Sequence, residues 1–82
     1  MKVRINIFKE RLKQLREQKG FTLSELGAKI GVTRQAIIKF ENDKAFPSFW
    51  ILCDLAEALS VSVSYLVGQT DDPKVRKPRK KD

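Results

Sequence analysis

Histidine is absent from this chain of 82 residues, and Cys53 is its single cysteine. One cysteine cannot form a disulfide within the chain, and a zinc cluster would have neither histidines nor further cysteines to draw on. Without histidine, a glycine-rich phosphate loop or a Ser/His/Asp or Cys/His set, the usual catalytic groups are missing as well. We therefore expect an intracellular protein with no cofactor, no structural metal and no enzymatic activity.

Long apolar runs are also missing. No stretch approaches the roughly 18 apolar residues that a membrane span needs. The first eight residues, MKVRINIF, are too short and too interrupted by charge for a signal peptide. We expect a protein that has no membrane partner and lies in the cytoplasm.

Acidic residues are the minority among the charged ones. The chain has 17 Lys and Arg against 10 Asp and Glu, a net charge of +7. Residues 1–68 contain 11 of the basic and 7 of the acidic residues, and residues 69–82 contain 6 and 3. Both parts would be attracted to a polyanion. The charge alone leaves two interpretations open, a soluble basic surface or a surface that binds nucleic acid.

Helix signals recur along the first 68 residues. Thr22 and Glu25 have the spacing of a capping box, Gly31 is a suitable helix-ending glycine, and Thr33 can cap the helix that follows. Apolar residues three and four apart give each helix a buried face, with Phe49 among the buried residues of the fourth. We expect helices at about residues 7–18, 23–30, 34–42, 49–59 and 63–67.

Five short helices without a strand signal predict an all-α fold. We expect one compact five-helix domain over residues 1–68, a length at which a single core is the rule. From Gln69 the apolar periodicity stops, and residues 69–82 combine basic residues with two prolines. This composition predicts a flexible, disordered basic tail.

Residues 22–41, TLSELGAKIGVTRQAIIKFE, place two expected helices on either side of a tight turn at Gly31. This segment resembles the helix-turn-helix of lambda-repressor-like and Cro-like regulators, the xenobiotic-response-element type. The stretches PSF, LCDLAEAL and VSVSYLVG match that family's fourth and fifth helices, and the match covers about residues 8–68. The positions in the helix-turn-helix that carry it are Leu26, Gly31, Val32, Ile37 and the pair Phe40 and Glu41.

The resemblance implies a lambda-repressor-like DNA-binding domain with a helix-turn-helix at about residues 22–42. Two positions depart from the family pattern. Gly27 stands where the family usually has alanine at the contact between the two helices. Leu23 stands where it often has a glutamine that braces a DNA phosphate, and a leucine cannot make that contact.

In such a domain the third helix enters the major groove and its first residues meet base edges. Arg34 and Gln35 are therefore expected to contact bases, since Arg pairs with guanine and Gln with adenine. Ile38 lies one turn further on, in an otherwise polar stripe. Two interpretations of Ile38 stay open, contact with a thymine methyl group or shielding by the loop at residues 45–47.

Other polar residues around the third helix are expected to contact the DNA backbone. For the cap residues among them, the alternative is a purely structural role, and for Arg34 it is a phosphate contact or a solvated charge. The expected backbone contacts are Ser24, Thr33, Lys39, Asn42 and Lys44. The resemblance also suggests that Arg16 and Glu41 form a partly buried ion pair with a structural role.

Trp50 is expected on a charged face of the fourth helix, with Ile51 beside it. Exposed aromatic residues on a small domain suggest a dimer or partner surface, although the first residues or the tail would also serve as a cover. The rival surface is the fifth helix, with Val63, Tyr65 and Val67, because relatives of this type often dimerise there.

These features favour a sequence-specific regulator of transcription, a repressor that binds a pseudo-palindromic double-stranded-DNA operator as a homodimer in a bacterial cytoplasm or nucleoid. An alternative is an antitoxin-like regulator that holds a protein partner on the Trp50 surface and uses the helix-turn-helix for autoregulation. A third is non-specific coating of the nucleoid, which predicts equal affinity for all DNA.

Overall fold

The computed structural model describes residues 3–74, and over this range it contains helices and no strands. The predicted all-α fold is confirmed. The first helix begins at Ile5 rather than at about residue 7, and the other bounds agree with the expected ones to within a residue or so. The five helices are α1 (Ile5–Gln18), α2 (Leu23–Ile30), α3 (Arg34–Glu41), α4 (Phe49–Leu59) and α5 (Val63–Leu66).

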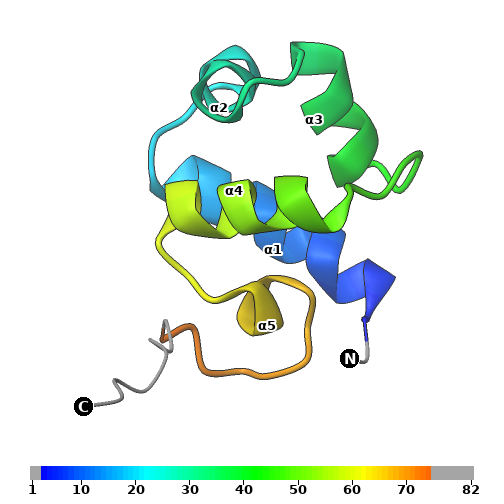
Figure 1. Ribbon diagram of the computed structural model, residues 1–82, viewed down its shortest axis with the longest axis vertical. Coiled ribbons are helices and arrows are strands. Elements are labelled where there is room, and N and C mark those ends of the chain that lie inside the picture. Colours follow the sequence, from blue (N-terminus) through cyan, green and yellow to red (C-terminus); the bar gives the residue numbers. More distant parts are fainter. Residues whose placement is uncertain (1–2, 75–82) are drawn as a thin grey trace.

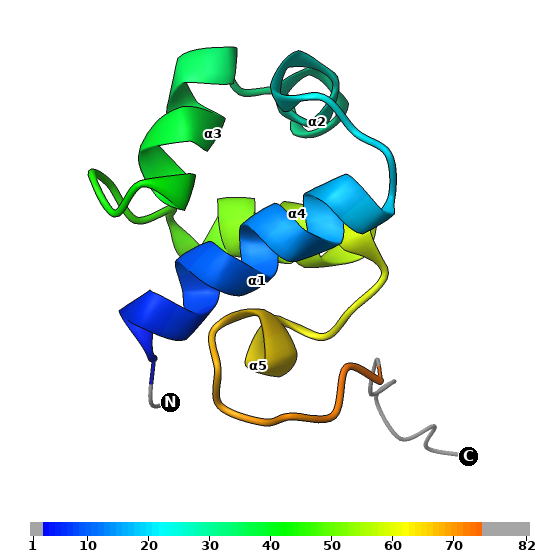
Figure 2. The ribbon, with the colours of Figure 1, turned by 180° about the vertical axis from the view of Figure 1, so that it is seen from behind.

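Figure 1 shows α2 and α3 together at one end of the molecule, with α1 and α4 crossing its middle and α5 at the opposite end. Figure 2, the view from behind, places α1 in front of α4 and leaves the helix-turn-helix free of cover on its outer side. The core fills the space between the helices. Its fully buried side chains are Phe8, Leu12, Leu26, Ile37, Leu55, Leu59, Leu66 and Val67.

Local capping sets where α2 and α3 begin. The Thr22 hydroxyl accepts from the Glu25 amide at 3.0 Å, and the Glu25 carboxylate accepts from the Thr22 amide at 2.8 Å, so the predicted capping box is formed. Gly31 ends α2 in a left-handed conformation with φ of 78°, which costs glycine nothing. Thr33 then caps α3 through the Ala36 amide at 3.1 Å. The caps and Gly31 therefore set where α2 begins and ends and where α3 begins.

Gly27 is the point of closest approach between α2 and the turn. A Cβ atom built on it would lie 2.7 Å from the Val32 carbonyl oxygen and 3.2 Å from the Thr33 carbonyl carbon. Both neighbours are backbone atoms, which cannot rotate away as a side chain can. The glycine at this position, where the family usually has alanine, therefore stands where the turn leaves no room for a Cβ atom.

Replacing Gly27 by alanine is expected to lower the free energy of unfolding by about 1–2 kcal/mol, because the strain of moving the turn exceeds the gain in helix propensity. Urea denaturation followed by circular dichroism measures the change. Lys29→Ala, at an exposed neighbouring position of α2, is the control and should change stability by less than about 0.5 kcal/mol. A more stable Gly27→Ala variant would show that the turn moves aside freely.

Two expectations about burial and order are wrong. Phe49 was expected in the core and is 57% exposed, because its ring lies beside that of Trp50, with 5.8 Å between the ring centres, and is not part of the core cluster. Residues 69–74 were expected to begin a disordered tail, yet they are bonded to the helices. The Ser62 amide donates to the Pro73 carbonyl at 3.1 Å, and the Gln69 amide donates to the Ser64 carbonyl at 2.8 Å.

The remaining tail residues, 75–82, lie outside the described range. Along residues 3–74, no helix combines the length and the apolar character that crossing a bilayer requires.

Candidate nucleic-acid interface

α3 has one buried face and one exposed face. Ile37 and Phe40 are buried against the rest of the domain, whereas Arg34, Gln35 and Lys39 are exposed. The predicted base-contacting residues therefore share the outer side of α3 with the predicted backbone contact Lys39. Nothing in residues 3–74 covers Arg34 or Gln35, so both can reach a ligand without rearrangement of the domain.

Ile38 lies between the two faces of α3. It is partly exposed, and it is not among the partly buried apolar side chains of residues 3–74 that pack against the core, a set to which its neighbour Ala36 belongs. Its apolar surface therefore contributes little to the core. This position fits a residue that packs on something outside the described chain.

The expected backbone contacts surround α3 and are all exposed. Ser24 lies in the first turn of α2, where the helix dipole and the first amides, which have no partner within the helix, favour an anion. Asn42 ends α3 and donates from Nδ2 to the Ile38 carbonyl at 2.8 Å. The Lys44 amide donates to the Lys39 carbonyl at 2.9 Å, so the loop folds back and holds Lys44 near the end of α3.

Both cap residues have a structural role. The Thr33 hydroxyl accepts a hydrogen bond from the Ala36 amide, and the Asn42 side chain donates a second hydrogen bond to the Ile38 carbonyl, which also accepts the Asn42 amide. A hydroxyl that accepts one hydrogen bond still has a proton to donate. Contact with a phosphate and capping are thus compatible at Thr33.

Arg16 and Glu41 join α1 to the end of α3, as the resemblance suggested. Arg16 Nε lies 2.6 Å from Glu41 Oε2, and Nη2 lies 3.2 Å from Oε1, a bidentate pair. The two side chains are only 11% and 7% exposed. Arg16 Nη1 also donates to the Phe21 carbonyl at 2.9 Å. One guanidinium therefore links α1, the α1–α2 connection and α3.

The hydrogen bond from Arg16 to Glu41 raises the pKa of Arg16 above its ordinary value, and burial opposes this with a smaller effect. A cation whose pKa is raised on folding adds stability that is present below its unfolded pKa and is lost only as the pH rises through its folded pKa. Arg16 therefore keeps its charge and this contribution throughout the neutral pH range.

The structure separates the two candidate dimer or partner surfaces. Trp50 is 76% exposed, whereas Ile51 beside it is partly buried and packs against the core. On the α5 side, Val67 is fully buried, so its prediction as a surface residue is wrong. Val63 and Tyr65 are partly buried and pack against the core.

Arg11 is a residue that the sequence analysis missed. Its Nη1 donates to the carbonyls of Tyr65 at 2.6 Å and Thr70 at 2.8 Å, and its Nη2 lies 2.7 Å from Asp71 Oδ1. Its guanidinium carbon lies 3.9 Å from the centre of the Tyr65 ring. One sign of this role was present in the sequence, a charged residue directly before the buried Leu12. The residues that Arg11 contacts, however, are 54 to 60 positions away along the chain. This Arg11 clamp ties residues 70–71 to α1.

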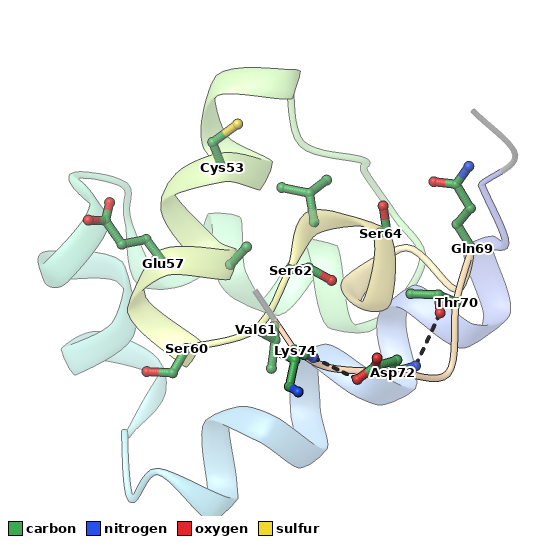
Figure 3. Close-up of a pocket in the computed structure, with 12 residues that line it drawn as sticks. Cys53, Glu57, Ser60, Val61, Ser62, Ser64, Gln69, Thr70, Asp72 and Lys74 are labelled. Atoms are coloured by element: carbon green, nitrogen blue, oxygen red, sulfur yellow. Dashed lines mark hydrogen bonds between the residues drawn. The ribbon is translucent and has the colours of Figure 1, made fainter. Parts of the chain in front are cut away.

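A cleft of about 840 Å³ lies between α4, α5 and residues 69–74 (Figure 3). Its lining mixes apolar residues, Ala56, Val61 and Val63 among them, with polar ones that include Glu57 and Thr70. None of the predicted DNA contacts lines it, and α5 lies at the end of the molecule opposite the helix-turn-helix (Figure 1). The cleft is therefore separate from the candidate interface.

A family model described as helix-turn-helix matches residues 12–66, which span α2 and α3 and most of the core. The chain belongs to this family, the lambda-repressor and Cro-like helix-turn-helix regulators. YobD of Bacillus subtilis strain 168, named as an uncharacterized HTH-type transcriptional regulator, is 37% identical over 71 residues, which cover 87% of this chain and 63% of YobD. The chain spans about three fifths of the length of the first curated relatives that it matches.

Solved structures of other family members resemble the chain. The P22 c2 repressor bound to a synthetic operator has a TM-score of 0.74 and 28% identity, and the match covers 78% of this chain and 97% of the repressor chain in that structure. A structure of SinR, the master regulator for biofilm formation, in complex with DNA has a TM-score of 0.67 and 37% identity, and the match covers 72% of this chain and 95% of the SinR chain in that structure. A complex of SinR with SinI matches at a TM-score of 0.69 and 36% identity, over 73% of this chain and 59% of that one.

Proposed function

We propose that this helix-turn-helix protein is a sequence-specific, double-stranded-DNA-binding regulator that represses transcription by occupying a promoter. The observation that carries this proposal is that Arg34 and Gln35 are exposed on α3 of a helix-turn-helix, with the partly exposed Ile38 one turn further on. The P22 c2 repressor and SinR, which share the fold, are known in complexes with DNA. We place its action in the bacterial cytoplasm or nucleoid, without a catalytic step.

In the proposed complex, α3 lies in the major groove. Arg34 donates two hydrogen bonds to a guanine and Gln35 pairs with an adenine, each worth about 1–3 kcal/mol of discrimination. Ser24, Thr33, Lys39, Asn42 and Lys44 contact phosphates and set the register. Two copies bind a pseudo-palindromic operator whose half-sites lie about 34–36 Å apart, one turn of the duplex.

Selection of bound fragments from a random DNA pool, with the whole chain as bait, tests this proposal. We expect one recurring half-site, repeated with two-fold symmetry about one turn apart. A competition gel shift at fixed salt then compares the selected site with random DNA, because the charge term alone varies steeply with salt. Equal affinity for both would favour non-specific coating of the nucleoid instead.

Ile38 gives a smaller, base-specific prediction. Ile38→Ala is expected to weaken binding to the selected site, and the loss should shrink when one particular thymine is replaced by uracil, which lacks the methyl group. Fluorescence anisotropy with the two DNAs measures the difference. An equal loss on both would assign Ile38 to packing against the loop at residues 45–47.

A second candidate function is a regulator controlled by a bound protein. It is favoured by the 76% exposure of Trp50 and by the existence of a SinR complex with SinI. Purification of the chain from its native host distinguishes this second function from the first. A stoichiometric partner would support this second function, and a chain that shifts its own promoter fragment alone would support the first.

A further inference from the structure

Residues 69–74, which we call the strap, form one wall of the cleft described above, and α4 and α5 form the others (Figure 3). The strap is held at two points. The Arg11 clamp binds it near its start, and the Ser62 amide donates to the Pro73 carbonyl near its end, at 3.1 Å. The cleft is therefore formed in the folded domain. Its volume of about 840 Å³ lies within the range of about 300–1,000 Å³ that is usual for small-molecule sites.

The lining of the cleft combines apolar surface with hydroxyl groups. Its apolar members are Cys53, Ala56, Val61 and Val63. The Ser62 hydroxyl, which also lines the cleft, accepts a hydrogen bond from the Tyr65 amide at 3.0 Å and keeps its proton to donate. Small-molecule sites commonly have such a lining, in which apolar surface packs on the body of the ligand and a few polar groups orient it.

The charge of the cleft is opposite in sign to that of the whole chain. Among the residues that line it, Glu57 and Asp72 are acidic and Lys74 is basic, which leaves one negative charge in excess, whereas the chain carries +7. In Figure 3, Glu57 lies on one side of Val61 and Asp72 on the other. Neither carboxylate has an ion-pair partner among residues 3–74. Both are therefore available to a positively charged ligand.

We propose that the cleft binds a small organic cation, an amine with an apolar body. The body packs on the apolar lining, and the ammonium group faces Glu57 or Asp72. The same two carboxylates repel an anion of equal size. This proposal goes beyond the proposed function and does not rest on it, because α5 and the cleft lie at the end of the molecule opposite the helix-turn-helix (Figure 1).

The exposure of the two carboxylates limits how strongly they select a cation. Glu57 and Asp72 are both exposed, so water screens their attraction for an ammonium group. Exposed ion pairs of this kind change an equilibrium by about two- to fivefold each. An amine with a single aromatic ring is therefore expected to bind with a dissociation constant on the order of 1–10 mM, and its uncharged analogue more weakly.

Cys53 is the single cysteine of the chain and lines the cleft, so the reactivity of its thiol reports on occupancy directly. The whole chain is labelled with 4,4′-dithiodipyridine, an uncharged disulfide reagent, in the presence of increasing 2-phenylethylamine at constant ionic strength. We expect the amine to slow the labelling of Cys53 severalfold and to saturate. N-acetylcysteine in the same solutions is the control, and its labelling should not change. An amine that leaves the labelling of Cys53 unchanged would overturn the proposal.

Two analogues of the amine test the charge of the ligand. 2-Phenylethanol and 3-phenylpropionate keep the aromatic ring and replace the ammonium group by a hydroxyl and by a carboxylate. We expect the alcohol to protect Cys53 only at concentrations several times higher than the amine, and the carboxylate to protect it least. Equal protection by all three compounds, or better protection by the carboxylate, would overturn the choice of a cation.

Variants of the two carboxylates locate the bound amine. Glu57→Gln and Asp72→Asn each remove one charge, and the asparagine keeps an oxygen that can accept the Lys74 amide as Asp72 does. Each is expected to weaken binding of 2-phenylethylamine about two- to fivefold and to leave 2-phenylethanol unaffected. Glu10→Gln removes an exposed carboxylate of α1 outside the cleft and should change neither. Parent-like binding of the amine in both cleft variants would overturn the proposal. Circular dichroism confirms that the variants are folded.

Labelling of the free chain tests another occupant, the chain itself. Residues 75–82 follow Lys74 directly and contain five basic residues, which are also complementary to the carboxylates of the cleft. If the cleft is open, Cys53 in the free chain reacts much faster than unfolding of the domain allows. A thiol that reacts only as fast as the chain unfolds would show a cleft already filled, and would overturn the proposal. None of these measurements uses DNA, so their outcome is independent of the selection that tests the proposed function.

Discussion

Replacing Arg16 by alanine is expected to lower the free energy of unfolding by about 3–5 kcal/mol, enough to unfold much of a small domain at physiological temperature. Its carboxylate partner, Glu41, is only 7% exposed and would be left buried without a counter-charge. The Phe21 carbonyl would lose its donor as well. Urea denaturation at neutral pH, where Arg16 is charged, measures the loss.

A double replacement separates the ion pair from the space it fills. Arg16→Met with Glu41→Leu removes both charges and keeps most of the volume, so its stability should lie much closer to that of the parent than that of Arg16→Ala. The cycle of single and double variants gives the coupling energy directly. An Arg16→Ala variant with an unchanged midpoint would show that water reaches Glu41 freely, contrary to its burial.

The same pair has a consequence for DNA binding. The Arg16 guanidinium binds Glu41 at the end of α3 and the Phe21 carbonyl just before α2. It therefore ties both sides of the helix-turn-helix to α1. A Glu41→Gln variant keeps a hydrogen-bonding group of the same shape without its charge. If this variant is folded, we expect weaker binding to the selected site.

Replacing Gln35 by alanine is expected to cost about 1–3 kcal/mol of discrimination at a single A·T pair, roughly 5- to 150-fold in relative affinity. Gln35 is exposed near the start of α3, where the first residues of a recognition helix meet base edges. Repeating the selection from random DNA with the variant shows whether the preference relaxes at one position of the half-site.

Lys39→Ala is the matched control for Gln35→Ala. Both residues are exposed on α3, four positions apart. A phosphate contact carries no sequence information, so Lys39→Ala should weaken binding to all sequences alike and reduce the salt dependence by about one counterion. If Gln35→Ala behaves in the same way, Gln35 is a backbone contact and the assignment of base contacts on α3 is wrong.

The local structure of the helix-turn-helix could be predicted from residues close together in the sequence. The capping box of Thr22 and Glu25 and the Thr33 cap join atoms three residues apart, and their geometry is the same in any helix. The alternation of buried and exposed residues on α3 follows from the helical period. The roles of Arg34, Gln35 and Ile38 in DNA binding remain predictions from these positions and from the family resemblance.

The Arg16 and Glu41 pair shows where sequence reasoning depended on the family. The two residues are 25 positions apart, and composition and periodicity alone give no reason to join them. The family resemblance supplied the pairing. The structure added the burial of both side chains and the third contact to the Phe21 carbonyl.

The sequence by itself determined the helices, their caps and the family, because these depend on local bonding geometry and on a motif of fixed spacing. Only the tertiary structure decided which apolar residues are covered. It buried Val67, left Phe49 exposed, and tied residues 70–71 to Arg11 across more than 50 positions of the chain. Burial and such distant contacts depend on how whole helices pack, and a periodic pattern does not specify what lies opposite each face.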